Sequence, residues 1–337
     1  MQGRLAVKPK GLYVLRADAF DKVYGPHEQE EIAGLLDIAA EPQTKETLQE
    51  RPELLADVEI ILSGWGAPTM DEAFLACAPN LKAVFYGAGS TRRVVTEAFW
   101  QRGILVTSAY AANAVPVAEY TLATILLSLK RFWQLSSAVR REGAYPLVKD
   151  VPGAYGTTVG LVSLGKIGRL VRERLRPFAL NVLAYDPKVS EDEANDLNVE
   201  AVSLEALFER ADVVSLHTPW LKETEGLIGG AHLASMKTNA TLINTARGAI
   251  IREGEMLEIL RERPDLYAVL DVTYPEPPEP GSDLYTLPNV VLSPHIAGSL
   301  GGECRRMGRV MVEELRRYLA GEPLRWAISE AEAKVMA

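Results

Sequence analysis

Residues 157–168 read TTVGLVSLGKIG, and this stretch decides the fold of the 337-residue chain. Its apolar first half predicts a β-strand, and the residues that follow it have a helical pattern. The turn between them, Ser163-Leu164-Gly165-Lys166-Ile167-Gly168, matches the fingerprint G-x-G-x-x-G except that Ser163 replaces the first glycine. An acid, Asp186, ends the next predicted strand, 18 residues after Gly168 (186 − 168). Strand, glycine turn, helix and acid in this order predict a dinucleotide-binding βαβ unit.

The residue types of this turn fit the binding of a pyrophosphate. Gly165 lets the backbone approach the ligand, Gly168 lets the helix pack closely on the strand, and the helix N-terminus offers free N–H groups. Because Ser163 carries a Cβ atom, we expect a negative φ there. Asp186 can accept hydrogen bonds from a ribose 2′-hydroxyl and would repel a 2′-phosphate, which favours NAD over NADP. Lys188 nearby keeps NADP as an alternative.

Short apolar runs alternate with helical patterns on both sides of this stretch, which predicts an α/β protein with two doubly wound parallel sheets. The first series ends near residue 112, and the second covers residues 113–297. A closing helical pattern after residue 300 can return to the first series. We therefore expect one discontinuous domain, residues 1–112 and 298–337, with residues 113–297 inserted as the second. One long helix is expected over residues 116–142, with Pro116 in its first turn and a wide apolar surface that suits a dimer contact.

Composition limits the classes of function and the compartment. The net charge of −9 argues against nonspecific binding to nucleic acid or to anionic lipid. The two cysteines, Cys77 and Cys304, form no disulfide framework, which favours a cytoplasmic protein. The most apolar window, residues 114–129, contains Pro116 and Glu119 and is too short for a membrane span. We expect no targeting segment, no membrane span and, in the absence of a metal-binding motif, no metal.

Three polar residues follow apolar runs in the second half of the chain. Arg247 follows TLINTA, Glu276 lies in the loop after YAVLDV, and His295 follows VVLSP. In an open α/β sheet, ligands bind outside the carboxyl ends of the strands, so these residues should converge on one crevice. Each of them alone is more commonly a structural or solvated residue. Their joint occurrence beside a predicted cofactor site favours catalysis.

The chain closely resembles the D-isomer-specific 2-hydroxyacid dehydrogenases over about residues 58–320. The likeness is carried by the fingerprint and by YGAGS (86–90), NAVPVAEYTLATILLSLKR (113–131), LHTPWLKETEGLI (216–228), LINTARGAII (242–251), LDVTYPEPP (270–278) and VVLSPHIAG (290–298). It implies that Arg247, Glu276 and His295 are the catalytic triad. It also implies a Rossmann NAD domain inserted in a discontinuous flavodoxin-like substrate domain, and homodimers formed through the NAD domain.

The resemblance further implies which residues contact the cofactor and the substrate. Those lining the cofactor would be Gly165, Lys166, Ile167, Gly168, Asp186, Thr218, Thr224, Thr245, Ala246, Asp271 and Gly298. Asp271 would hold the nicotinamide amide. Ala88 and Gly89 would present backbone N–H groups to the substrate carboxylate, with which Arg247 would pair.

The chemistry of these groups suits reduction of a 2-keto acid. Hydride reaches C2 while the carbonyl oxygen needs a proton, which His295 would supply with Glu276 orienting its ring. Arg92 and Arg93, after the glycine loop, either favour a dianionic substrate or lie on a solvated helix start. Two alternatives stay open: a phosphite- or formate-type dehydrogenase, and an NAD-sensing interaction protein like the co-repressors that share this fold. Formate enzymes carry a glutamine where this chain has Glu276.

Overall fold

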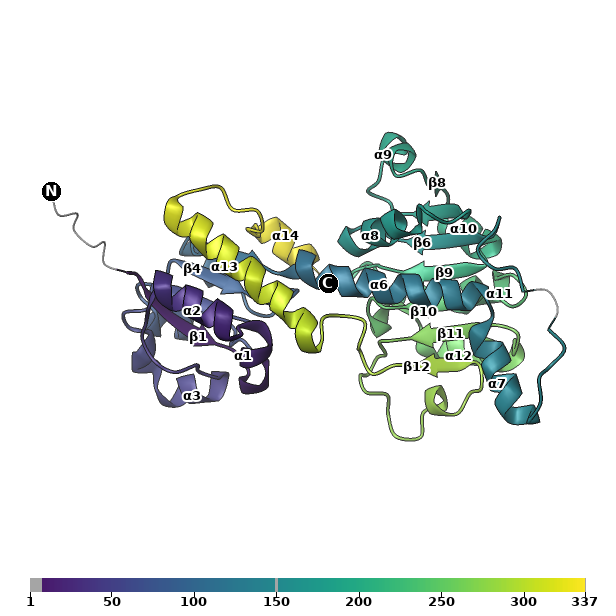
Figure 1. Ribbon diagram of the computed structural model, residues 1–337, viewed down its shortest axis with the longest axis horizontal. Helices are drawn as coiled ribbons and strands as arrows, with labels where there is room; N and C mark the ends of the chain where they lie inside the picture. Colours follow the sequence, from purple (N-terminus) through teal and green to yellow (C-terminus); the bar gives the residue numbers. More distant parts are fainter. Residues whose placement is uncertain (1–7, 149–150, 337) are drawn as a thin grey trace. The chain divides into compact units, whose positions relative to one another are not determined.

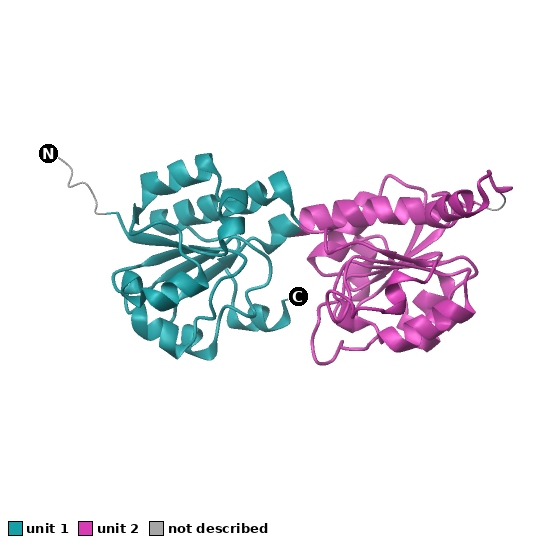
Figure 2. Ribbon diagram, turned by 90° about the horizontal axis from the view of Figure 1, so that it is seen from below, with its two compact units in different colours: residues 1–113, 299–336 teal, residues 114–298, 337 magenta. Residues whose placement is uncertain are grey.

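The computed structural model describes residues 8–148 and 151–336, which form two compact units (Figure 2). Unit 1 contains residues 1–113 and 299–336, and unit 2 contains residues 114–298. The chain crosses from one unit to the other after Asn113 and again after Gly298. Unit 1 is therefore discontinuous in sequence, and unit 2 is continuous.

Unit 1 is built on a parallel five-stranded sheet with the order β2-β1-β3-β4-β5, the flavodoxin-like order (Figure 1). Its strands are β1 (Lys10–Val14), β2 (Asp37–Ile38), β3 (Ile60–Ser63), β4 (Ala83–Tyr86) and β5 (Leu105–Ser108). Its helices are α1 (Ala17–Val23), α2 (Pro26–Leu35), α3 (Lys45–Glu50), α4 (Glu72–Cys77), α5 (Glu97–Gln101), α13 (Cys304–Ala320) and α14 (Glu330–Val335), with 3-10 turns η1 (Pro52–Leu55) and η4 (Gly301–Glu303).

The late helix α13 joins unit 1 through an apolar stripe. Met307, Met311 and Leu315 recur every four residues, are fully buried, and pack in one core with side chains of β1, β3 and β4. A Cβ atom at Gly308 would lie 1.9 Å from the carbonyl oxygen of Val23, so only glycine allows this approach to α1. The return of α13 completes the first unit.

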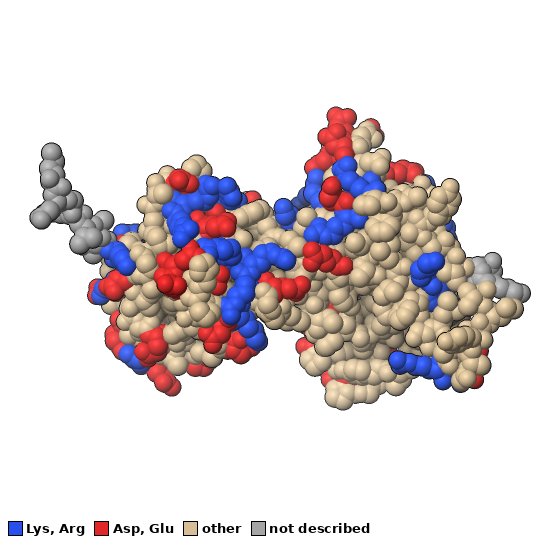
Figure 3. Space-filling model, viewed as in Figure 1, with Lys and Arg blue, Asp and Glu red and all other residues tan. Residues whose placement is uncertain are grey.

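Ion pairs connect the outer faces of α2 and α13. Glu31 of α2 pairs with Arg309 and Arg316 of α13 and with His27 one turn earlier. The hydrogen bond from Arg309 lowers the pKa of Glu31 to about 2. Figure 3 shows basic and acidic side chains mixed over this face of unit 1.

Unit 2 is built on a parallel seven-stranded sheet with the order β12-β11-β10-β9-β6-β7-β8. Its strands are β6 (Thr158–Val162), β7 (Asn181–Tyr185), β8 (Glu200–Ala201), β9 (Val213–Leu216), β10 (Thr241–Asn244), β11 (Tyr267–Leu270) and β12 (Val290–Leu292). Its helices are α6 (Tyr110–Leu129, which starts in unit 1), α7 (Phe132–Glu142), α8 (Lys166–Leu175), α9 (Glu191–Asp196), α10 (Leu204–Arg210), α11 (Gly230–Ser235) and α12 (Glu253–Glu262), with 3-10 turns η2 (Gly248–Ile250) and η3 (Asp283–Tyr285).

The strand order of unit 2 has one switch point. From β6 the chain proceeds through β7 to β8 in one direction, and β9 to β12 then continue on the other side of β6. This is the Rossmann order with a seventh strand at the β12 edge. Ligands of such sheets bind where the order reverses, so the crevice beyond the carboxyl ends of β6 and β9 is the expected place.

The single helix expected over residues 116–142 is wrong in two respects. The helix α6 begins at Tyr110, which places Pro116 inside it, and a break at Arg131, where φ is 50°, separates α6 from α7. The indole N–H of Trp133 donates to Ser128 Oγ at 3.2 Å across the break. This bond spans the bend, which no proline or glycine in the sequence marks. After α7, residues 143–148 and 151–155 contain no helix or strand.

Among the described residues, α6 is the one helix long and apolar enough to cross a membrane by length and composition. In the structure, 56% of that window is buried inside the protein. Its residues Ala118, Ile125 and Leu129 pack in one core with side chains of β6 and β7. The helix α6 thus has the packing of a core helix of unit 2.

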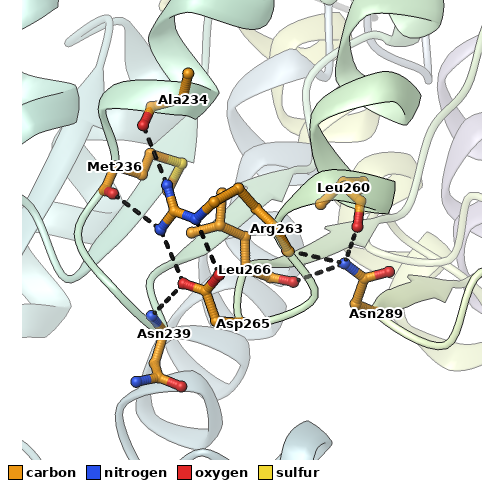
Figure 4. Close-up of polar contacts among 8 residues, drawn as sticks. All are labelled: Ala234, Met236, Asn239, Leu260, Arg263, Asp265, Leu266 and Asn289. Atoms are coloured by element: carbon orange, nitrogen blue, oxygen red, sulfur yellow. Dashed lines mark hydrogen bonds and ion pairs between the residues drawn. The ribbon is translucent and has the colours of Figure 1, made fainter.

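Polar side chains connect the amino ends of three strands of the unit 2 sheet, at the end opposite the switch-point crevice (Figure 4). Arg263 forms two hydrogen bonds of 2.9 and 2.8 Å with Asp265, and Asp265 accepts the backbone N–H of Asn239. The amide of Asn289 donates to the carbonyls of Leu260 and Leu266 at 2.8 and 3.0 Å. These bonds join the amino ends of β10, β11 and β12.

Candidate active site

The fingerprint turn after β6 has the left-handed conformation that the sequence argued against. Ser163 has φ of 77°, so the expected negative φ is wrong. Its backbone N–H donates to the carbonyl of Tyr185, and its hydroxyl lies 3.0 Å from the hydroxyl of Thr218. A left-handed residue with a Cβ atom costs roughly 1–2 kcal/mol. The hydroxyl pair offsets that cost, which explains how serine occupies a glycine position.

The two remaining glycines of the turn differ in what surrounds them. A Cβ atom at Gly168 would lie 2.2 Å from the carbonyl oxygen of Ser163, so the start of α8 can approach β6 only with glycine there. Gly165 is the N-cap of α8, and a Cβ atom on it would meet nothing within 4 Å in the described structure. The space above Gly165 is therefore open, beside the N-terminus of a ten-residue helix. This geometry fits a pyrophosphate.

Asp186 faces the same turn from the end of β7. Its carboxylate accepts the backbone N–H of Leu164 at 2.7 Å and that of Lys188 at 2.9 Å. The turn and the acid are thereby held together before any ligand binds. A carboxylate fixed at this place suits a ribose diol.

The other side of the crevice is formed by the residues after β9. His217 is buried, its Nε2 lies 3.1 Å from Ser215 Oγ, and burial lowers its pKa to about 4. The imidazole is therefore neutral at pH 7. Thr218 forms the hydroxyl pair with Ser163, and Thr224 accepts the backbone N–H of Leu221 at 2.8 Å. These bonds order the loop after β9.

Arg247 lies in a loop after β10 that its neighbours hold tightly. Asn244 accepts the N–H of Ala246 at 3.0 Å and donates to the carbonyl of Arg247 at 2.9 Å. A Cβ atom at Gly248 would lie 2.0 Å from the backbone of Thr273, so the loops after β10 and β11 touch directly. Thr245, just before Ala246, is buried. The backbone that presents Arg247 is thus fixed from both sides.

A small cavity lies behind this loop, lined by Asn244, Gly248, Ile251, Glu253, Met256, Leu270, Val272 and Thr273. Glu253 accepts a hydrogen bond from the backbone of Tyr274, and burial raises the pKa of its carboxyl group. Tyr274 stands two residues before Glu276. The helix α12, which begins at Glu253, is therefore tied to the loop that carries Glu276.

Glu276 and His295 form a direct pair. Glu276 Oε1 lies 2.6 Å from His295 Nδ1, and the two side chains are 43% and 48% exposed. His295 has φ of 54°, and its backbone N–H donates to the carbonyl of Asp271 at 2.9 Å. The pair leaves Nε2 of His295 as the nitrogen that can face a ligand.

Asp271 supports the loop of His295. Its buried carboxylate accepts N–H groups from Ile296 at 2.8 Å and Ala297 at 2.9 Å, and the hydroxyl of Ser293 at 2.6 Å. Gly298 ends this loop and unit 2. The resemblance implied a cofactor role for Asp271; in the structure its carboxylate holds the backbone after His295 and the side chain of Ser293 before it.

The expected substrate loop belongs to unit 1. Ala88 is buried, and the hydroxyl of Ser108 donates to its carbonyl at 3.1 Å. Gly87, just before it, donates its N–H to the carbonyl of Ser63 at 2.8 Å. Gly89 is half-buried, while Arg92 and Arg93 further along are exposed. The loop is thus anchored within its own unit.

Comparison with known proteins identifies the family. The sequence model described as "D-isomer specific 2-hydroxyacid dehydrogenase, NAD binding domain" matches residues 122–297. A glyoxylate reductase of Korarchaeum cryptofilum is 34% identical over 287 residues, which are 83% of this chain and 85% of that protein. The chain belongs to the D-isomer specific 2-hydroxyacid dehydrogenase family.

Two further members of this family are informative about the length and the fold of the chain. A D-3-phosphoglycerate dehydrogenase of Archaeoglobus fulgidus is 33% identical over 261 residues, 77% of this chain but 49% of that protein. The chain thus spans about half the length of this relative. The NAD-complexed family member from Lactobacillus delbrueckii ssp. bulgaricus has a TM-score of 0.78 at 21% identity and covers 95% of this chain and all of that one. The predicted fold class is confirmed, and NAD is the cofactor of the inserted unit.

The structure also brings two hydroxyl residues of α6 to the loops after β10 and β12. Tyr120 of α6 reaches Ser293 at 2.7 Å, and Thr121 reaches Thr245 at 3.1 Å. No pattern in the sequence singled them out, because α6 contains other polar residues, among them Glu119, Thr124 and Ser128. The described residues contain no group of three His, Cys, Asp or Glu side chains that could hold a metal ion.

Proposed function

We propose that this protein is an NAD-dependent D-2-hydroxyacid dehydrogenase that acts as a 2-keto acid reductase. The observation that carries the proposal is the Glu276–His295 pair, with 2.6 Å between Oε1 and Nδ1, at the carboxyl edge of the NAD-binding sheet. An acid that holds one ring nitrogen of a histidine leaves the other free to exchange a proton with a substrate.

The proposed mechanism assigns one task to each side chain. When bound, the nicotinamide supplies or accepts a hydride at C4. His295 as imidazolium donates a proton from Nε2 to the carbonyl oxygen of the keto acid, and in the reverse direction the neutral ring accepts it. Glu276 holds Nδ1–H and stabilises the charged ring. Arg247 binds the substrate carboxylate, for which its planar guanidinium is suited.

We assign the cofactor and substrate contacts by the family resemblance together with the local geometry. The pyrophosphate would lie over Gly165 at the start of α8, where a Cβ atom would meet open space. Asp186 would bind the adenosine ribose. Lys166, Ile167, Gly168, Thr218, Thr224, Thr245, Ala246, Asp271 and Gly298 would line the rest of the cofactor. Residues 1–112 and 298–337 would form the substrate domain, with Ala88 and Gly89 binding the carboxylate through backbone N–H groups.

We also propose that two copies of the chain associate through α6 and α7. The helix α7 has no buried residue although it contains Phe132, Trp133 and Leu135. Leu127 and Phe132 are exposed, and the segment that follows exposes Tyr145 by 92% and Leu147 by 81%. Figure 3 shows few charges on the face of unit 2 along which α6 and α7 run in Figure 1. Exposed apolar area of this kind is typical of an interface. A dimer by sedimentation velocity, broken by Phe132→Glu, is the expected result, and a wild-type monomer at micromolar concentration would contradict it.

The experiment that tests the activity follows oxidation of NADH, and of NADPH in parallel, with a panel of acids. The panel contains glyoxylate, pyruvate, hydroxypyruvate and 3-phosphohydroxypyruvate, with phosphite and formate tested as donors to NAD. We expect turnover of at least one keto acid, faster with NADH. The ratio of kcat/KM for 3-phosphohydroxypyruvate to kcat/KM for hydroxypyruvate tests whether Arg92 and Arg93 select a dianionic substrate. Oxidation of phosphite or formate with no keto acid reduced, or NADH binding without any turnover, would overturn the proposal.

A further inference from the structure

Two adjacent hydroxyl residues of α6 each reach a different catalytic loop. The phenol oxygen of Tyr120 lies 2.7 Å from Ser293 Oγ, two residues before His295. The hydroxyl of Thr121 lies 3.1 Å from the hydroxyl of Thr245, two residues before Arg247. One helix therefore contacts the loops of both the proposed proton donor and the proposed carboxylate-binding cation.

The direction of the hydrogen bonds on the Tyr120 side follows from chemistry. Ser293 Oγ donates its proton to the carboxylate oxygen Oδ1 of Asp271, over 2.6 Å. Because the Ser293 hydroxyl has only this one proton, the phenol of Tyr120 must be the donor to Ser293 Oγ. Burial raises the pKa of Tyr120, so the phenol keeps its proton at neutral pH. The result is a directed chain from Tyr120 through Ser293 to Asp271.

This series of hydrogen bonds determines which donors each oxygen of the Asp271 carboxylate accepts from. Oδ1 accepts from Ser293 and from the N–H of Ile296, while Oδ2 accepts the N–H of Ala297. Within the described part of the chain, Oδ2 has this one donor and keeps acceptor capacity. With Oδ1 fixed by two donors, the carboxylate cannot rotate without breaking both. Tyr120 therefore also fixes the direction of the oxygen that can accept from the cofactor amide.

The His295 loop needs such support. His295 has φ of 54°, a left-handed backbone conformation that residues with a Cβ atom seldom adopt. The loop is held at the backbone of Ile296 and Ala297 by one carboxylate. A carboxylate with a fixed orientation confines the loop, and with it the imidazole, more narrowly than one free to turn.

The Thr121 side repeats this arrangement for the other loop. Thr121 and Thr245 are both buried, so their hydroxyl pair is shielded from water. Thr245 precedes Ala246, whose N–H is held by Asn244. The start of the Arg247 loop is thereby joined to α6 as well as to its own strand.

We propose that Tyr120 and Thr121 are positioning residues, which hold the His295 and Arg247 loops against one rigid helix before ligands bind. The inference rests on the proposed function for its catalytic consequence, but the positioning itself concerns the unliganded protein. It can therefore be measured whether or not the protein reduces a keto acid.

The test compares Tyr120→Phe and Thr121→Val with a control, Ser128→Ala. Ser128 is a buried hydroxyl residue of the same helix whose bonds, to Thr124 and Trp133, stay within α6 and α7. The first readout is hydrogen–deuterium exchange of the amides of residues 295–297 in the unliganded protein. The second is kcat and KM for the best keto acid of the panel.

Tyr120→Phe should speed exchange of these amides about fivefold and lower kcat by a similar factor, the effect of losing one hydrogen bond. Thr121→Val should instead raise KM for the keto acid, and Ser128→Ala should change neither readout. If Tyr120→Phe does not fold, Ser293→Ala removes the same link, and Ser293→Thr, which keeps the hydroxyl, should restore slow exchange. Unchanged exchange at residues 295–297 in a folded Tyr120→Phe, or in Ser293→Ala where Tyr120→Phe does not fold, would overturn the inference. Exchange that rises in a protein with no turnover would overturn the proposed function alone.

Discussion

Ser163 and Thr218 face each other across the crevice between β6 and β9, with their hydroxyl oxygens 3.0 Å apart. This is the point where the strand order of the NAD-binding unit reverses, and Ser163 stands where the fingerprint has its first glycine. The side chain that the fingerprint excludes is thus tolerated because a second hydroxyl, 55 residues later (218 − 163), binds it.

Ser163→Ala and Ser163→Gly should therefore differ in stability. Alanine keeps the Cβ atom at φ of 77° but loses the hydroxyl bond, whereas glycine loses the bond and removes the strain. We expect alanine to lower the free energy of unfolding by about 1 kcal/mol. Glycine should be more stable than alanine by about 1 kcal/mol. Urea unfolding measures both, and an alanine variant as stable as the wild type would show that the pair contributes nothing.

Gly165→Ala and Gly168→Ala should separate cofactor binding from folding. The added methyl at Gly168 meets the Ser163 carbonyl, so we expect a loss of stability of about 1–3 kcal/mol. At Gly165 the methyl enters open space, so the variant should melt like the wild type but bind NADH several-fold more weakly. Thermal unfolding and NADH fluorescence titration provide the two readouts. Wild-type NADH affinity in Gly165→Ala would place the pyrophosphate elsewhere.

His217 should make the protein acid-sensitive over a defined window. Burial lowers its pKa to about 4, below its ordinary value near 6.5. The folded state thus binds the proton less readily, so the stability from this group is present above pH 6.5 and is lost as the pH falls to 4. The loss should be about 3 kcal/mol. Urea unfolding at pH 7 and pH 5 should show a smaller difference for His217→Asn than for the wild type. If the free energy of unfolding changes equally between pH 7 and pH 5 in both proteins, His217 is not the source of the acid sensitivity.

Glu276→Gln tests the charge of the catalytic pair. Glutamine keeps the size and one hydrogen bond but cannot stabilise the imidazolium, so kcat should fall about tenfold or more. Glu279→Gln is the matched control, since Glu279 is exposed in the same loop. Steady-state kinetics with the best keto acid provide the comparison. Equal activity of both variants would remove Glu276 from the mechanism.

The sequence predicted what depends on local pattern. The strand-turn-helix at residues 157–168, the acid at the end of β7 and the positions of Arg247, Glu276 and His295 after β10, β11 and β12 are all visible in short stretches. The left-handed φ of Ser163 was missed because its compensating partner, Thr218, is distant in sequence. The break at Arg131 was missed because no glycine or proline marks it.

Contacts between residues far apart in the sequence, and very short strands, could not be predicted because no local pattern marks them. Tyr120 and Ser293 are 173 residues apart, and a tyrosine in an apolar helix has no pattern that names its partner. The strands β2 and β8 have two residues each, too few to show alternation. They exist because a neighbouring strand, β1 or β7, offers a free edge.

The most direct test of the central claim is the kcat/KM for NADH-dependent keto acid reduction by the wild type and by His295→Ala. If His295 donates the proton, the variant should bind NADH normally and lose at least about 10²-fold in kcat/KM. Undiminished reduction by His295→Ala would contradict the account.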